Sequence, residues 1–208
     1  MTLPPLSETQ LDALKEISNI GMGHAATALS QMIGETVYLR VPRITIADIT
    51  EMPDLVGGPE EVVVGITLRI FGDARGTILL IFPRESAQQM LVRLIGHKPR
   101  GLVFNEMSAS ALKELGNILA SAYLSALGNL LHMTLIPSIP LLAYDMAGAV
   151  LDNVLIELSQ VGDLALMVET EFHDQSPSED VIRGHFMILP DPGTLDVILE
   201  AARGGHDG

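Results

Sequence analysis

An internal repeat constrains the fold of this chain more than any other feature of its sequence. Residues 13–20 read ALKEISNI, and residues 111–118, which lie 98 positions later, read ALKELGNI. The same spacing relates further pairs: Ala28 and Ala126, Leu29 and Leu127, Thr36 and Thr134, Pro42 and Pro140. A match of this extent is not expected from chance, and two units are too few for a solenoid. We therefore interpret the 208 residues as a single domain of two homologous halves, about 1–100 and 101–208.

Each half is expected to begin with a long helix and to continue into strands. Apolar or small residues recur at three- and four-residue steps after residue 11 and after residue 112, with Ser7 and either Asn105 or Ser108 as candidate N-caps. Apolar runs rich in β-branched residues predict strands at 37–49, 60–72, 76–83, 132–142, 149–159, 163–172 and 185–190. Short helices are expected at 84–95 and 193–202. This order predicts an α/β (α+β) fold with a pseudo-twofold repeat, a shared, mostly antiparallel sheet, and the two long helices on one face.

The composition excludes several classes of function. Lys and Arg total 12 against 26 Asp and Glu, and a surface with a formal net charge of -14 repels nucleic-acid phosphates and anionic membranes. The absence of Cys excludes disulfides and thiolate chemistry, and no His pair has the spacing of a zinc site. The N-terminus has no signal-peptide pattern, and Pro137 and Pro140 interrupt the uncharged stretch 118–144. We therefore expect a cytoplasmic protein that does not span a membrane.

The two predicted long helices have polar residues at matching positions. Asp12, Glu16 and Asn19 are spaced i, i+4 and i+7, which places them along one helical face. The same pattern occurs in the second half at Ser110, Glu114 and Asn117. An Asn inside a helix costs roughly 0.5 kcal/mol relative to Ala, so its occurrence twice at one place in a repeat calls for a reason. A solvated helix face is one explanation, and a functional site present in two copies is the other.

The chemistry of these side chains favours the positioning of a water molecule. A carboxamide donates and accepts hydrogen bonds at once, although it is a poor general base. A Glu can act as a base, accept a hydrogen bond or pair with a cation on a partner. Because no nucleophile or metal set accompanies them, these residues predict an apparatus that positions water in the active site of another protein. In phosphoryl hydrolysis such alignment dominates catalysis.

The pattern Asp/Ser-x3-Glu-x2-Asn-x22-Pro, which occurs twice, resembles that of the CheC family of bacterial and archaeal chemotaxis proteins, within the wider CheC, CheX and FliY phosphatase group. Its positions are Asp12, Glu16, Asn19 and Pro42, then Ser110, Glu114, Asn117 and Pro140. The resemblance extends over nearly the whole chain, from LKEISNIGMGHAATALS through VVVGITL and GTILLI to MILPDPGTLDVIL. The second copy departs from the first, because Leu119 and Ser121 replace Gly21 and Gly23.

The resemblance implies an activity that agrees with the chemistry of the side chains. Members of this family hydrolyse the aspartyl phosphate of the response regulator CheY. By resemblance, Asn19 and Asn117 would orient the attacking water, and Glu16 and Glu114 would contact a lysine of CheY and anchor it. The magnesium ion would belong to phosphorylated CheY, so we expect this chain to need no cofactor or metal of its own.

The remaining motif residues are expected to support docking. By resemblance, Asp12 and Ser110 would lie at the edge of the docking surface, and Pro42 and Pro140 would shape the chain beside each helix. Family members also bind CheD, a receptor-modifying glutamine deamidase, and the segment around Asp145 (YDMAGAV) resembles their CheD-contacting region. The alternative is a non-catalytic module, either a CheD-regulating scaffold or a flagellar-switch adaptor like the FliM middle domain. A pure scaffold would have no need for two Glu-x2-Asn sets. A monomer is favoured, because the repeat can supply internally the contacts of a homodimer.

Overall fold

The computed structural model describes residues 8–41, 43–96, 105–158, 164–174, 182–191, 193, 194 and 197. Its helices are α1 (Glu8–Ile33), η1 (Ile49–Glu51), α2 (Met52–Leu55), α3 (Arg84–Ile95), α4 (Glu106–Leu131) and α5 (Ala147–Leu158). Its strands are β1 (Val37–Arg40), β2 (Ile44–Asp48), β3 (Val62–Gly72), β4 (Gly76–Pro83), β5 (Leu135–Pro137), β6 (Leu141–Met146), β7 (Leu164–Asp174) and β8 (Ile182–Pro190). The described strands form one sheet in the order β1-β7-β8-β4-β3-β5, in which β2 also pairs with β7 and β6 with β3.

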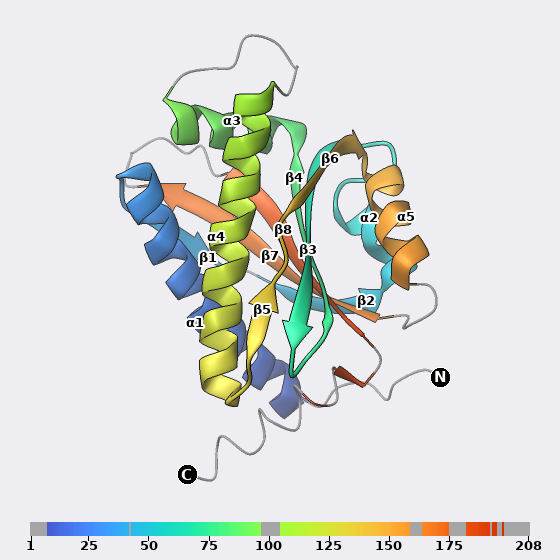
Figure 1. The fold of residues 1–208 in the computed structure, drawn as a ribbon. Coiled ribbons are helices and arrows are strands. Elements are labelled where there is room, and N and C mark those ends of the chain that lie inside the picture. The colour runs from blue at the N-terminus through green and yellow to red at the C-terminus, as the bar shows by residue number, and fades with distance from the viewer. Residues whose placement is uncertain are drawn as a thin grey trace.

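Helices cover both faces of the sheet (Figure 1). A large buried cluster lies between the sheet and the layer formed by α1, α3 and α4, and it includes Phe82, Tyr123 and Phe186. On the opposite face, α2 and α5 pack over β3, β4 and β8, with Met52 and Val150 among the buried residues. Because both faces are covered, successive side chains of β4 are buried on alternate sides, which explains its unbroken apolar run ILLIF at 78–82.

The two halves exchange strands in the shared sheet. β1 and β2 of the first half pair with β7 of the second, and β5 and β6 of the second half pair with β3 of the first. β4 and β8 pair at the centre, and every one of these described pairings is antiparallel, as predicted. The long helices α1 and α4 are both 26 residues long, begin 98 positions apart, and run in opposite directions (Figure 1). That the halves are copies of one ancestral unit stays a prediction.

Local signals placed several element boundaries correctly. Asn105 is the N-cap of α4, because its Oδ1 accepts a hydrogen bond from the backbone N–H of Ser108 at 2.8 Å. The helix expected at 84–95 is α3, and Gly96 ends it in the left-handed conformation, with φ 74°. Ser7, the other candidate cap, and most of the helix expected at 193–202 lie outside the described residues.

One strand prediction was wrong, and two others were only partly correct. Residues 149–159 were expected to be a strand because they include several β-branched residues, but residues 149–158 belong to α5. Ala147, Val150, Leu151 and Val154 recur at three- and four-residue steps, and all four are buried against the sheet and α2, so the helical period outweighs the strand propensity. The strands expected at 37–49 and 132–142 are each divided in two, into β1 and β2 and into β5 and β6.

Candidate functional site

The motif side chains form an exposed stripe on each long helix. On α1, Asp12, Glu16 and Asn19 are all exposed. The buried residues of the same helix alternate with them at helical spacing and pack into the large core: Ile17, Met22, Ala25 and Leu29. Tertiary packing therefore fixes which face of α1 is presented to solvent, and that face includes the Glu-x2-Asn residues.

The second stripe is similar but not identical. On α4, Ser110 and Glu114 are exposed, whereas Asn117 is half-buried. The opposite face of α4 is packed against the sheet through Leu112, Leu115 and Leu119. The two asparagines therefore occupy matching positions in the sequence but differ in their accessibility.

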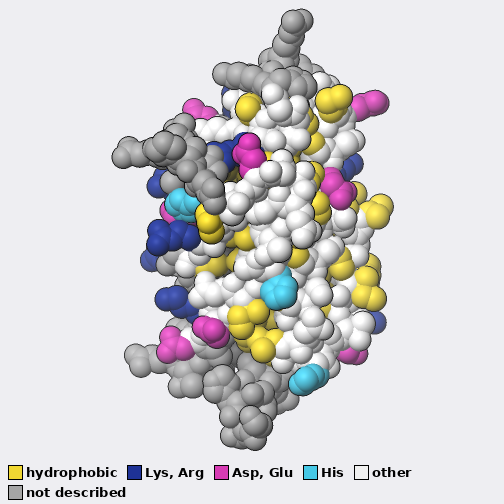
Figure 2. Space-filling model, turned by 90° about the vertical axis from the view of Figure 1, so that its left-hand side faces the viewer, with side chains coloured by type: hydrophobic (Ala, Val, Ile, Leu, Met, Phe, Trp, Pro, Cys, Tyr) yellow, Lys and Arg dark blue, Asp and Glu magenta, His cyan; other side chains and the backbone are white. Residues whose placement is uncertain are grey.

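The side chains of the two Glu-x2-Asn sets are not engaged by the rest of the described structure. Among the described residues, none makes a hydrogen bond or ion pair with the side chains of Glu16, Asn19, Glu114 or Asn117. Figure 2 shows the side of the molecule on which α1 lies, where acidic and basic side chains appear as separate groups and form no continuous patch. Polar side chains without internal partners are available to a docking protein.

A buried contact between the helices lies directly behind the first stripe. The hydroxyls of Ser18 and Tyr123 are hydrogen-bonded to each other, with 3.3 Å between Oγ and the phenolic oxygen. Burial raises the pKa of Tyr123 to about 12, although the hydrogen bond with Ser18 opposes part of that shift. The phenol is therefore uncharged at neutral pH, and the contact does not change over the physiological range.

Gly21 allows the two helices to approach closely at this point. A Cβ added to Gly21 would lie 2.5 Å from Cδ2 and 2.8 Å from Cε2 of Tyr123, which is closer than non-bonded carbon atoms come. Gly23, two residues later, has open space at the same position. The sequence singled out both glycines as a difference between the two motif copies, but only the structure shows that Gly21 alone is needed for packing.

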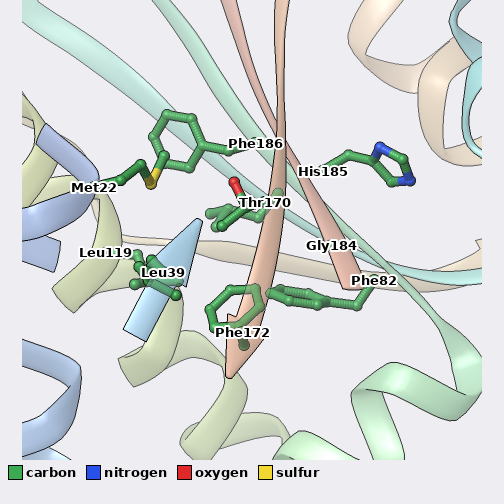
Figure 3. Close-up of a pocket in the computed structure, with 10 residues that line it drawn as sticks. Met22, Leu39, Phe82, Leu119, Thr170, Phe172, Gly184, His185 and Phe186 are labelled. Carbon is green, nitrogen blue, oxygen red and sulfur yellow. The ribbon is translucent and has the colours of Figure 1, made fainter. Parts of the chain in front are cut away.

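The interior behind the motif helices has no room for a substrate. The cavity between α1, α4 and the sheet measures about 10 Å³, roughly the minimum for one water molecule. Figure 3 shows that Met22, Leu119, Phe172 and Phe186 surround it, and that the His185 ring points away from it. Because this cavity is apolar and so small, any molecule that reaches the motif residues has to approach from outside.

The motif prolines are associated with the breaks in the edge strands. Pro140 is half-buried in the connection between β5 and β6, which both pair with β3, and Ser138 in the same connection donates its backbone N–H to the carbonyl of Arg69 at 2.8 Å. Pro42 lies outside the described residues, between β1 and β2, which both pair with β7. A proline cannot donate to a strand ladder, which accounts for a break beside Pro140.

Asp145 lies apart from both stripes. It is exposed near the end of β6, just before α5, and its Oδ1 accepts a hydrogen bond from the backbone N–H of Met146 at 2.8 Å. Because α5 covers the face of the sheet opposite α1 and α4, this segment and the motif helices can be reached from different sides (Figure 1).

The described residues contain no group of three or more His, Asp or Glu side chains that could hold a metal ion. Within the same residues, no helix combines the length and the apolar character that crossing a membrane requires.

Comparisons with known proteins show the family of this chain. The profile of the CheC-like family matches residues 10–46, and that of the chemotaxis phosphatase CheX matches residues 64–150. The CheY-P phosphatase CheC of Bacillus subtilis (strain 168) is 39% identical over 199 residues, which cover 94% of this chain and 95% of that protein.

Two solved structures are similar in fold. Thermotoga maritima FliY matches with a TM-score of 0.77 and 18% identity, and the match covers 97% of this chain and 100% of that one. The FliM middle domain from H. pylori matches with a TM-score of 0.64 and 14% identity over 94% of this chain and 99% of that one. At such identities the likeness concerns the fold alone.

Proposed function

The chain belongs to the CheC family, and we propose that it hydrolyses the aspartyl phosphate of the response regulator CheY at two Glu-x2-Asn sites, one on α1 and one on α4. The relationship to a CheY-P phosphatase over nearly the full length of both chains makes it an enzyme of that class. One structural observation supports the two-site mechanism most directly: each helix presents its Glu and Asn away from the packed core, with no described residue bound to them.

In the proposed mechanism the asparagine carboxamide is inserted beside the phosphoaspartate of CheY. Its NH₂ group donates to, or its oxygen accepts from, the attacking water and holds it in line with the phosphorus atom. The chain would supply no nucleophile, and the magnesium ion that would neutralise the phosphoryl oxygens would be bound by CheY. Asn19 or Asn117 then contributes to catalysis by aligning the attacking water with the phosphorus atom. This role requires that the asparagine side chain be accessible to CheY and held in a fixed direction.

The glutamates are proposed to anchor the regulator. Glu16 and Glu114 precede the asparagines by three residues, so each lies about one helical turn before its asparagine on the same helical face. A carboxylate there can pair with a lysine of CheY, and burial of that pair in the complex strengthens it relative to an exposed ion pair.

We further propose that the protein acts as a monomer in the cytoplasm.

Replacement of both glutamates is expected to weaken binding more than turnover. In the Glu16→Gln/Glu114→Gln variant, the KM for phosphorylated CheY should rise by about tenfold, because removing one partner of an interfacial charge pair commonly costs this much or more. The kcat should change less, since both asparagines remain. The measurement is the decay of phosphorylated CheY at several CheY concentrations. A matched control is Glu51→Gln, an exposed glutamate before α2 on the other face of the sheet. An unchanged KM would contradict the anchoring role.

The same assay with the wild-type chain tests the proposed function itself. Acceleration of CheY-P decay by substoichiometric protein is the expected result. If the wild type does not accelerate the decay, the catalytic proposal fails, and the non-catalytic scaffold or switch adaptor takes its place. The FliM likeness does not favour that alternative, because it concerns the fold alone.

CheD binding is the second part of the proposal, and the exposed segment around Asp145 supports it. Asp145 and Met146, which is 48% exposed, lie at the end of the edge strand β6, on a side that a docked CheY would leave open. Asp145→Arg is expected to weaken CheD binding by about tenfold through charge reversal, while CheY-P hydrolysis changes less than about twofold. Titration calorimetry with CheD and the decay assay measure the two effects. Loss of both activities together would indicate a misfolded variant, which a urea unfolding curve would reveal, and unchanged CheD binding would refute the assignment.

A further inference from the structure

The first motif asparagine lies over a tight contact between the two long helices. Gly21 is buried on α1, and its Cα faces the ring of Tyr123 on α4, so that any Cβ at this position would come within 2.5 Å of the ring. Ser18, also buried, shares a hydrogen bond with the hydroxyl of the same ring. Tyr123 therefore touches α1 on both sides of Asn19 in the sequence, at residue 18 and at residue 21.

The ring of Tyr123 is itself held from behind. Its centroid lies 4.7 Å from that of Phe186 on the central strand β8, with the two planes inclined at 45°. Tyr123 is 1% exposed and Phe186 is 2% exposed, so both rings are held within the packed core. Phe186 on the sheet thus supports the ring of Tyr123, and that ring in turn supports α1 at Gly21.

This contact sets the direction in which Asn19 points. Successive helical residues are rotated by about 100°, so Gly21 and Asn19 are about 200° apart around α1 and lie on nearly opposite faces. A displacement of the helix at Gly21 therefore moves Asn19 outward by a similar distance. Building on the proposed function, we propose that Gly21 and Tyr123 are positioning residues of the first phosphatase site: their contact fixes the depth and rotation of α1 at which Asn19 aligns the attacking water.

The second site is not built in this way. At the offset of 98 residues, Gly21 corresponds to Leu119, Tyr123 to Ala25, and Ser18 to Gly116. The close approach of α4 is made at Gly116, and it is directed at the sheet, where an added Cβ would lie 2.6 Å from Cγ2 of Ile66 on β3. The Gly21–Tyr123 pair should therefore affect Asn19 much more than Asn117.

The test measures each site by itself. Asn117→Ala leaves only the first site and Asn19→Ala leaves only the second, and Gly21→Ala is introduced into each of these parents. In the Asn117→Ala parent we expect Gly21→Ala to lower kcat for CheY-P hydrolysis by about tenfold, because displacements near 1 Å cost this much or more where alignment dominates. The KM should change by less than about twofold, since docking tolerates small shifts better than water alignment does. In the Asn19→Ala parent, kcat should fall by less than about twofold.

Two further variants separate positioning from a general loss of structure. Tyr123→Leu in the Asn117→Ala parent removes the ring edge that a Cβ at residue 21 would meet, and it should also lower kcat, because α1 loses its support. The double variant Gly21→Ala/Tyr123→Leu in the same parent should have a higher kcat than Gly21→Ala alone, since Leu can turn its δ-carbons away from the new methyl group. Gly23→Ala is the matched control for the unfolding midpoint in urea, because it makes the same substitution on the same helix where the added Cβ meets nothing.

The outcomes distinguish this inference from the proposed function. If both parents accelerate CheY-P decay but Gly21→Ala, folded by its urea curve, lowers kcat equally in both or in neither, the positioning role is refuted. If Gly21→Ala does not fold, Tyr123→Leu is introduced into the Asn19→Ala parent as well, and the positioning role is refuted if it lowers kcat equally in both parents or in neither. If wild type and both parents are all inactive on CheY-P, the proposed function is refuted, and with it any role of Gly21 and Tyr123 in hydrolysis.

Discussion

The Asn19→Ala/Asn117→Ala variant is expected to lose essentially all acceleration of CheY-P decay, a reduction of about 100-fold or more in kcat/KM. The reason is that alignment of water by a carboxamide is the only step in the proposed chemistry that this chain performs, and the loss of one precisely placed hydrogen-bonding group commonly costs about this much. Binding of CheY should persist, because both glutamates remain.

Each single variant should keep part of the activity, since the other site is intact. Both side chains lie on the outer part of their helices and have no described partner, so alanine removes no internal hydrogen bond and is the better helix former. The unfolding midpoint in urea should therefore be unchanged or slightly raised. The decay of phosphorylated CheY with wild type, both single variants and the double variant is the decisive comparison. A double variant that retains wild-type activity would exclude the paired-asparagine mechanism.

Gly72→Ala is expected to have the largest effect on stability, a loss of about 3 kcal/mol or more in the free energy of unfolding. Gly72 ends β3 with φ 117°, a conformation that an L-residue adopts only under strain. In addition, a Cβ at this position would collide with the carbonyl oxygen of Thr134. A backbone atom cannot turn away as a side chain can, so strain and overlap add.

The collision would occur where residues 72–73 are hydrogen-bonded to the segment around Thr134. The backbone N–H of Asp73 donates to the carbonyl of Thr134 at 3.0 Å, and the N–H of Thr134 donates to Oδ2 of Asp73 at 2.7 Å. Moving Thr134 aside would break both hydrogen bonds and the pairing of Gly72 with Leu135. Equilibrium unfolding in urea measures the loss, with Gly23→Ala as the control, which should be stabilised by up to about 1 kcal/mol. Equal midpoints for the two variants would contradict this account of Gly72.

Local patterns in the sequence were sufficient for the elements that bear the site. The three- and four-residue recurrence of apolar residues predicts both long helices, as the structure has them. The i, i+4, i+7 spacing places Glu16 with Asn19 and Glu114 with Asn117 on one face of each helix, and the structure shows all of these exposed except Asn117, which is half-buried. For the cap of α4 the sequence left Asn105 and Ser108 open, and the structure selects Asn105. These features depend on residues a few positions apart, and the helical period relates such residues directly.

The prediction failed where two local signals conflicted. In α5 the β-branched residues Val150 and Val154 favoured a strand, while the spacing of the same residues favoured a helix. Burial against β3 and α2 decided between them, because packing of an apolar face contributes more than the small differences in propensity. The breaks between β1 and β2 and between β5 and β6 were missed although Pro42 and Pro140 lie in these segments, because the apolar residues on both sides of each proline were interpreted as one strand.

By itself, the sequence predicted an internal repeat and two long helices with matching Glu-x2-Asn sets, and it indicated which family those sets resemble. Only the tertiary structure decided that the halves exchange strands, that Asn117 is half-buried while Asn19 is exposed, and that α1 rests on Tyr123 at Gly21. The physical reason is separation along the chain. The hydroxyls of Ser18 and Tyr123 lie 3.3 Å apart but belong to residues 105 positions apart, and no local period relates such residues. Their contact exists because the sheet brings α1 and α4 together, and it is this contact that sets how the first asparagine is held.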